Sequence, residues 1–265
     1  MDRFDISPRR SLGQNFVTDP NTVRRIARLS GAGPADHVLE IGAGLGSLTL
    51  ALAETGASVR AVEIDHGLTA ALREVLAEAG ARRVEVVEGD AARLDFDEVL
   101  AGSDRWMLVA NLPYNIATPL VLDLLRDAGA IESMVVMVQR EVGERLAAPP
   151  GSRPRGIPSV LVERRGTARV VGRVPASVFR PRPKVESVVV RIERHAGREA
   201  PWPPEADARF ELLVRAGFGQ RRKMLRRSLA GLAGRESFAA AGVDPSSRPE
   251  ALTVDQWISL ARVMG

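Results

Sequence analysis

Short apolar runs rich in Val, Ile and Leu recur along the chain, and each is bounded by Gly, Pro or charged residues. Runs of this length and composition predict buried β-strands. We expect about seven strands, at residues 37–41, 58–63, 83–88, 105–110, 131–138, 168–174 and 185–192.

Amphipathic segments lie between these runs. In the first of them, Val23, Ile26 and Leu29 are spaced as on one face of a helix, which follows Asp19 as a helix cap and has Pro20 in its first turn. Strands that alternate with helices predict an α/β fold built from βαβ units. We expect the helices of this part at residues 20–29, 47–54, 66–79, 117–127 and 139–147.

The pattern changes near residue 196. Residues 196–205 are rich in Pro and Gly, which is typical of a linker, and the rest of the chain is helical in pattern. We therefore expect a first domain at residues 1–196 and a small all-α domain at residues 197–265. Its helices are predicted at residues 210–218 and 220–229 and within 248–263.

A glycine-rich turn, Glu40-Ile-Gly-Ala-Gly-Leu-Gly46, joins a predicted strand to a helix. Glycines there permit a tight turn and close approach of a ligand, and Glu63, at the end of the next strand, suits the two hydroxyls of a ribose. Glu40 beside the loop repels a diphosphate and suits a cation, which favours S-adenosylmethionine over a dinucleotide. Asp90, at the end of a third strand, either accepts a hydrogen bond from an adenine amine or caps the next segment.

The turn Asn111-Leu112-Pro113-Tyr114 follows the predicted strand at 105–110. Ligands of open α/β sheets bind at the carboxyl ends of strands. The Asn111 amide offers an acceptor, Pro113 has a fixed φ that aims its own carbonyl, and Tyr114 supplies a flat ring with a polar tip. These residue types suit a planar base with an exocyclic amine, although Asn and Pro are also common in plain strand-to-helix turns.

Cations are concentrated in the middle of the chain. Residues 139–198 contain 14 Lys and Arg against 5 Asp and Glu, whereas residues 1–138 contain 13 against 20. This asymmetry predicts that a polyanion docks on one side of the molecule. Three segments are candidates for contacting this polyanion. They are a loop at 149–158, an extended strap Phe179-Arg-Pro-Arg-Pro-Lys184 and, beyond the basic stretch, the helix predicted at 220–229, with Arg221, Arg222, Lys223, Arg226 and Arg227.

The strap and the loop lead to different expectations. Phe179 stands next to several cations, so we expect it to escape full burial and to stack on a base. For the loop, phosphate contacts by Arg153 and Arg155 and an ordinary surface role both remain open.

The composition of the chain argues against several classes of protein. No apolar stretch reaches the ~18 residues that cross a membrane, and the absence of Cys rules out disulfides and fits a reducing compartment. His37, His66 and His195 show no metal-ligand spacing, so we expect no metal. The first ten residues lack the apolar core of a signal peptide, and we expect a cytoplasmic protein.

Seven motifs in this order resemble the KsgA-type (RsmA) family of small-subunit ribosomal RNA adenine dimethyltransferases. They are Gly13-Gln-Asn-Phe16, Glu40-Ile-Gly-Ala-Gly-Leu-Gly46, Glu63-Ile-Asp65, Gly89-Asp90, Asn111-Leu-Pro-Tyr-Asn-Ile-Ala-Thr-Pro119, Phe179-Arg-Pro-Arg-Pro-Lys-Val185 and Gln220-Arg-Arg-Lys223. The resemblance implies a class I S-adenosylmethionine-dependent methyltransferase domain with a Rossmann-like sheet and a small helical RNA-binding domain. It also implies dimethylation at N6 of two adjacent adenosines near the 3′ end of 16S rRNA in an immature 30S subunit, by a protein expected to be a monomer.

Site residues follow from the same resemblance. It implies contacts to S-adenosylmethionine from Asn15, Val17, Gly42, Glu63, Asp90 and Asn111, with S-adenosylhomocysteine as product. It implies that Asn111-Leu112-Pro113-Tyr114 holds the target adenine and that Phe179 covers the other face of the base. Many relatives have Tyr-Gly-Arg/Ala-Leu-Ser where this chain has Arg155-Gly156-Ile157-Pro158-Ser159, so loop contacts to RNA are in doubt.

Other functions compete with this one. An Erm-type methyltransferase of 23S rRNA shares the catalytic motif, but the segment Asn115-Ile-Ala-Thr-Pro119 and the Gln220–Lys223 motif count against it. A NAD-dependent oxidoreductase is disfavoured by Glu40, and a ribosome-assembly binder without catalysis is disfavoured by the intact Asn111 and Tyr114.

Overall fold

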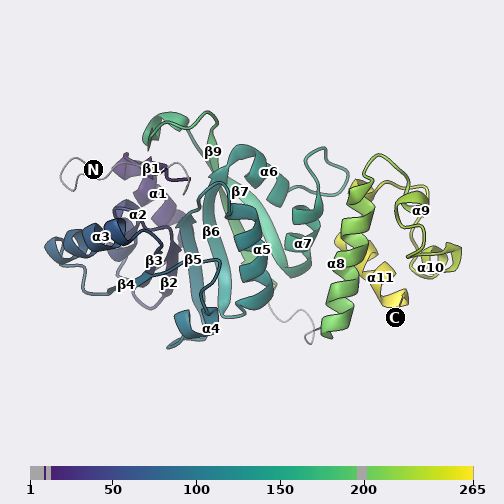
Figure 1. Ribbon diagram of the computed structural model, residues 1–265, viewed down its shortest axis with the longest axis horizontal. Coiled ribbons are helices and arrows are strands. Elements are labelled where there is room, and N and C mark those ends of the chain that lie inside the picture. Colours follow the sequence, from purple (N-terminus) through teal and green to yellow (C-terminus); the bar gives the residue numbers. More distant parts are fainter. Residues whose placement is uncertain (1–8, 10–12, 196–201, 265) are drawn as a thin grey trace. The chain divides into compact units, whose positions relative to one another are not determined.

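The computed structural model describes residue 9 and residues 13–195 and 202–264 (Figure 1). Its main sheet has seven strands in the order β4-β3-β2-β5-β6-β9-β7. The first five strands in this order are parallel, and β9 runs antiparallel to β6. The strands are β2 (His37–Ile41), β3 (Ser58–Glu63), β4 (Val84–Glu88), β5 (Trp106–Asn111), β6 (Ile131–Gln139), β7 (Gly166–Val174) and β9 (Ser187–Arg194).

This sheet confirms the predicted α/β class and each expected strand to within a few residues. A second, two-stranded sheet pairs β1 (Phe16–Val17) with β8 (Phe179–Arg180), which the sequence did not predict. The helices are α1 (Pro20–Ser30), α2 (Ser47–Ala53), α3 (His66–Glu78), α4 (Phe96–Val99), α5 (Ala117–Asp127), α6 (Arg140–Leu146), α7 (Ile157–Arg165), α8 (Pro204–Gly219), α9 (Leu225–Ser228), α10 (Arg235–Ala240) and α11 (Val254–Val263), with short 3₁₀ turns η3 (Ala176–Val178) and η4 (Pro249–Ala251).

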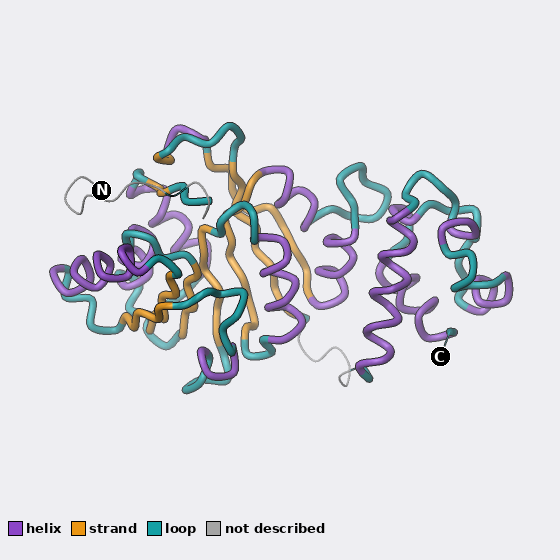
Figure 2. The backbone as a smooth tube through the Cα atoms, in the orientation of Figure 1, coloured by secondary structure: helices purple, strands orange, loops and turns teal. Residues whose placement is uncertain are grey.

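Helices pack on the sheet because its strands are apolar on both sides. Val38 of β2, Val109 of β5 and Val135 of β6 share one face with buried side chains of α1 and α2. On the other face, α5 lies over β6 (Figure 2). The side chain of Leu124 in α5 is buried. With helices on both faces, the edge at the carboxyl ends of the parallel strands is where this sheet can hold a ligand.

The chain forms two compact units. Residues 1–143 and 168–194 make up the first, and residues 144–167 and 195–265 the second. The predicted division at residue 196 differs from this clustering in the segment 144–167, whose helix α7 contacts α8 and α11. Residue 196 itself lies outside the described residues. Across the part of the chain that is described, no helix is both long and apolar enough to span a bilayer.

The helix predicted at 220–229 is wrong. Gln220 to Lys223 form a turn, and only Leu225–Ser228 are helical. The Leu225 and Arg226 amides donate to the carbonyls of Ser247 and Pro245, at 2.8 and 3.0 Å, so tertiary bonds replace those that a continuous helix would make. Met224, just before this short helix, is 41% exposed.

Candidate active site

A cavity of about 310 Å³ lies in the first unit at the carboxyl ends of β2, β3 and β5. It is flanked on one side by the segment Gly13–Val17 and on another by the turn after β5. The structure therefore brings together all the expected cofactor residues and four of the five expected catalytic residues. They are Asn15, Val17, Gly42, Glu63, Asp90, Asn111, Leu112, Pro113 and Tyr114.

The loop after β2 has the backbone that its glycines permit. Gly42, Gly44 and Gly46 all have positive φ, at 77°, 58° and 84°. A Cβ on Gly46 would lie 2.7 Å from Leu72 Cδ1, and a Cβ on Gly44 would lie 3.0 Å from the ring of Phe16. A side chain at Gly44 would therefore fill space beside Phe16 in the cavity lining, whereas one at Gly46 would clash with the core.

Glu63 is tied to the backbone around the cavity. Its Oε2 accepts from the Gly44 amide at 2.8 Å, and its Oε1 accepts from the amides of Ile64 and Asp65 at 3.0 Å each. A carboxylate has about four acceptor positions, so these bonds take three of them. Glu63 therefore shapes the glycine-rich loop in addition to the ribose contact that the sequence suggested.

Glu40 lines the cavity with an unpaired oxygen. Its side chain is 1% exposed, and its Oε2 makes no hydrogen bond within the described residues. Burial raises the pKa of Glu40 to about 8, the nearby Thr49 hydroxyl lowers it, and the charge of Glu63 raises it further. The carboxyl is thus mostly neutral at pH 7, whereas the sequence alone predicted a charged group beside the loop.

The orientation of Asn111 is set by the N-terminal segment. Its Nδ2 donates to the Asn15 carbonyl at 3.0 Å. Because one end of the amide is held in this way, Oδ1 is the end left to accept from a ligand. The sequence offered no signal for this contact, which joins residues 96 positions apart.

The expected role of the Pro113 carbonyl is wrong. That carbonyl accepts the amides of Ile116 and Ala117, at 3.2 and 3.1 Å, at the start of α5. Both of its lone pairs are thereby used. The turn needs these bonds because the first amides of a helix have no partner inside the helix.

Tyr114 and Asp90 each have a protein partner at the cavity. The Tyr114 hydroxyl lies 3.1 Å from Ser187 Oγ, a contact that the sequence did not predict. Burial raises the pKa of the Tyr114 phenol, and the bond to Ser187 lowers it. Asp90 lines the cavity and also accepts from the Ala92 amide at 3.0 Å, so both roles left open for it are compatible with the structure.

Phe179 is not among the cavity-lining residues. Its side chain is 4% exposed and packs in the core cluster with Val17 and Val174, so the expectation that it escapes burial is wrong. The cause is the pairing of β8 with β1, which brings Phe179 opposite Val17. Arg180, Arg182 and Lys184 follow it, and all three are exposed.

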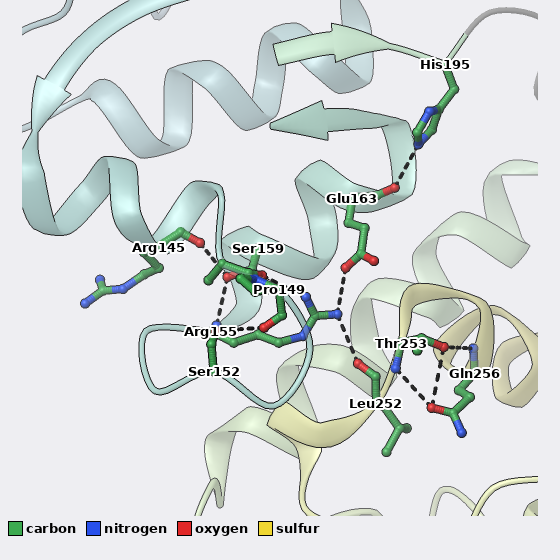
Figure 3. Close-up of polar contacts among 12 residues, drawn as sticks. Arg145, Pro149, Ser152, Arg155, Ser159, Glu163, His195, Leu252, Thr253 and Gln256 are labelled. Atoms are coloured by element: carbon green, nitrogen blue, oxygen red, sulfur yellow. Dashed lines mark hydrogen bonds and ion pairs between the residues drawn. The ribbon is translucent and has the colours of Figure 1, made fainter. Parts of the chain in front are cut away.

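Arg155 is a structural residue of the second unit, so the phosphate contact considered for it is wrong. Its side chain is fully buried. Its guanidinium donates to the carbonyls of Ala148 and Leu252, at 2.9 and 3.0 Å, and lies 2.7 Å from Glu163 Oε2 (Figure 3). It therefore fastens the loop 149–158 to the segment before α11.

The cations around Gln220 do reach solvent. Arg222, Lys223, Arg226 and Arg227 are exposed, whereas Arg221 is partly buried and donates to the Arg153 carbonyl at 2.7 Å. Among the described residues, no group of three or more His, Asp or Glu side chains is placed to hold a metal ion.

A family model described as ribosomal RNA adenine dimethylase matches residues 6–264. The chain belongs to this family. It is 48% identical to the ribosomal RNA small subunit methyltransferase A of Nocardia farcinica, over 98% of this chain and 91% of that protein. With the protein of the same name from Bifidobacterium adolescentis the identity is 44%, over 98% and 89%.

Solved structures agree with the adenine dimethylase family. The 23S rRNA methyltransferase ErmE superposes with a TM-score of 0.72 at 27% identity, covering 94% of this chain and 99% of that one. A dimethyladenosine transferase from Plasmodium falciparum superposes with a TM-score of 0.77 at 22% identity, covering 92% and 95%. The fold is therefore that of a class I S-adenosylmethionine-dependent methyltransferase.

Proposed function

We propose that this protein transfers methyl groups from S-adenosylmethionine to N6 of two adjacent adenosines near the 3′ end of 16S rRNA. One observation carries the chemical part of the proposal. In the lining of the cavity, Asn111 has its amide nitrogen held by the Asn15 carbonyl, so that its oxygen is left for an amine donor. Membership of the adenine dimethylase family supports the substrate class.

The cavity residues fit S-adenosylmethionine. An unpaired, buried carboxyl oxygen of Glu40 lines the cavity and suits a ligand that carries positive charge. The glycines of the loop leave room that a Cβ would fill. Glu63 and Asp90 would hold the ribose and the adenine, and Asn15 and Val17 would close over the ligand. When bound, this cofactor supplies an electrophilic methyl group on a sulfonium.

The residues of this chain would prepare the amine. An adenine N6 is a poor nucleophile because its lone pair is delocalised into the ring. Hydrogen bonds from its N–H groups to Asn111 Oδ1 and to a backbone carbonyl would favour a pyramidal nitrogen. Pro113 cannot supply that carbonyl because its oxygen already accepts two amides. Within the described residues no backbone amide outside the helices and strands donates to the carbonyl of Leu112, which would take this role.

The other requirements of the methyl transfer are binding and positioning of the base. Tyr114 would support the face of the base, which must leave any stack to reach the cavity. Methyl transfer in line with the sulfonium depends mainly on this alignment. The N6 proton becomes acidic once the nitrogen is alkylated, so no side chain is required as a general base. A second methylation requires that the pocket has room for the first methyl group.

We also propose that RNA is held outside the cavity by cations. The exposed Arg222, Lys223, Arg226 and Arg227 of the helical part (residues 197–265) and the strap after Phe179 would contact phosphates. The substrate would be an immature 30S subunit in the cytoplasm, and the enzyme would act as a monomer. Size-exclusion chromatography with light scattering checks the last point, and a dimer would contradict it.

Mass spectrometry of rRNA tests the proposal. Undermethylated 30S subunits are incubated with the protein and S-adenosylmethionine, and two dimethylated adenosines are expected in 16S rRNA. Naked 23S rRNA is the second substrate, since ErmE shares the fold at 27% identity. Methylation of 23S rRNA alone would support the Erm-type activity and overturn the proposal.

The variant Asn111→Ala tests the site itself. It removes the acceptor, and we expect loss of methyl transfer with 30S binding largely retained. The matched control is Asn21→Ala, an exposed residue of α1 away from the cavity, which should transfer methyl groups at the wild-type rate. Full activity of Asn111→Ala with tritiated S-adenosylmethionine would refute the role of this amide.

A further inference from the structure

The hydroxyl of Tyr114 is anchored by a residue far along the chain. Tyr114 Oη and Ser187 Oγ are 3.1 Å apart and come from segments separated by 73 positions. Tyr114 lies in the turn between β5 and α5 and is partly exposed to the cavity. Ser187, in contrast, is 0% exposed and does not line the cavity.

Ser187 is held in place by the sheet. It is the first residue of β9 and pairs with Gln139 of β6 in the antiparallel ladder. The residue before it, Glu186, accepts the Arg140 amide through its carbonyl at 2.9 Å. The Ser187 hydroxyl therefore comes from rigid backbone, whereas the Tyr114 ring comes from a turn.

A ring on a turn can rotate about two side-chain bonds, and each rotation changes the plane that it presents. A hydrogen bond at the tip of the ring removes most of this freedom. Burial of Ser187 also makes its hydroxyl dependent on a partner, because a buried hydroxyl without one is unfavourable.

We propose that Ser187 is a positioning residue of the methyl transfer, and that its bond to the Tyr114 hydroxyl fixes the ring on which the target adenine rests. The inference depends on the proposed function, because it assigns Tyr114 to the base. Ser187 touches neither the base nor the cofactor, and it acts through the ring. A phenylalanine at position 114 would offer the same face but would not be held.

Kinetics of a double-mutant cycle test this role. Ser187→Ala and Tyr114→Phe each remove one partner of the same bond, and we expect each to lower kcat on 30S subunits about two- to tenfold. The affinity for S-adenosylhomocysteine, measured by calorimetry, should stay within about twofold. The double variant should be no slower than either single variant, because only one bond is lost. Ser133→Ala, on β6 and away from the cavity, is the matched control.

A spectroscopic measurement detects the Tyr114–Ser187 bond without requiring methyl transfer. Tyr114 is the only tyrosine of the chain, so protein labelled with ¹³C at tyrosine Cζ gives one resonance. We expect Ser187→Ala to shift this resonance and Ser133→Ala to leave it unchanged. Ser187→Thr keeps a hydroxyl and should restore both the wild-type resonance and kcat.

The outcomes separate the two proposals. A wild-type kcat for Ser187→Ala, or single effects that multiply in the double variant, would overturn the positioning role. An unshifted ¹³Cζ resonance in Ser187→Ala would show that the bond is absent in solution, which also overturns it. A shifted resonance together with wild-type protein that methylates no 16S rRNA would instead reject the proposed function. If Ser187→Ala does not fold, Tyr114→Phe alone still decides, since an unchanged kcat contradicts the role.

Discussion

Replacing Glu40 by glutamine tests whether the buried carboxyl has a raised pKa that makes the stability of the protein depend on pH. The change keeps the shape of the side chain and removes its ability to ionise. In the unfolded chain the carboxyl has its ordinary pKa of 4.5, whereas burial raises the pKa to about 8 in the folded protein. Folding at pH 7 therefore requires that the carboxyl takes up a proton.

The size of the effect follows from the two pKa values. At pH 7, keeping this carboxyl neutral opposes folding by about 3 kcal/mol, because the pH lies roughly 2.5 units above the unfolded pKa. A raised pKa means that the stability is fully present below pH 4.5 and is lost as the pH rises towards 8. Glutamine does not ionise, and its unpaired amide costs about 1–3 kcal/mol at every pH. We therefore expect the free energy of unfolding of Glu40→Gln, relative to that of the wild type, to increase as the pH rises from 4.5 to 8.

Urea unfolding at several pH values measures this gain. The difference in free energy of unfolding, variant minus wild type, should increase by about 3 kcal/mol between pH 4.5 and 7 and level off above pH 8. The matched control is Glu98→Gln, an exposed residue of α4, whose difference should stay nearly constant. A difference that does not change with pH would refute the raised pKa of Glu40.

The raised pKa of Glu40 should also make the affinity for the cofactor depend on pH. A cationic ligand favours the ionised carboxylate, so binding of S-adenosylmethionine should release a proton below pH 8. Its affinity should then rise between pH 6 and 8 in the wild type and stay level in Glu40→Gln. Calorimetry in buffers of different ionisation enthalpy measures the released proton, and an equal pH dependence in the variant would refute the link to Glu40.

Three further substitutions test the structure. Glu63→Ala leaves three amides of the cavity wall without their acceptor, so it should lower the affinity for S-adenosylmethionine at least tenfold, as measured by calorimetry. Glu63→Gln should lower this affinity less, and an unchanged affinity in both variants would refute the assignment of Glu63 to the ribose. Arg155→Ala should destabilise the second unit by about 3 kcal/mol in urea unfolding, because it leaves Glu163 and two carbonyls without a partner, and a loss under 1 kcal/mol would contradict this. Gly46→Val should lower the melting temperature far more than Gly231→Val, because both glycines have φ of 84° but only at Gly46 does a Cβ meet a side chain; equal losses would exclude that clash.

Much of the first unit could be predicted because its signals are local. Apolar runs of strand length and a glycine-rich turn followed by a helix depend on neighbouring residues, and these predict β2, α2 and β3 to within a residue. The acid at the end of β3 and the turn at Asn111 lie where the open sheet has its ligand edge, and the cavity is there. The segment after Gly219 shows where prediction from local signals fails. Its sequence has a helical pattern, but its backbone instead makes hydrogen bonds with residues 245–247.

The sequence by itself determined the α/β sheet, the site at its carboxyl edge and the family of the chain, because periodicity, glycines and ordered motifs are written in consecutive residues. Only the tertiary structure decided which side chains are buried and which polar atoms are already paired. It buried Phe179 through the β1–β8 pair, turned Arg155 into a structural residue, and occupied the Pro113 carbonyl. It also joined Asn15 to Asn111 and Ser187 to Tyr114. Such contacts depend on distant segments meeting in space, which no local pattern encodes.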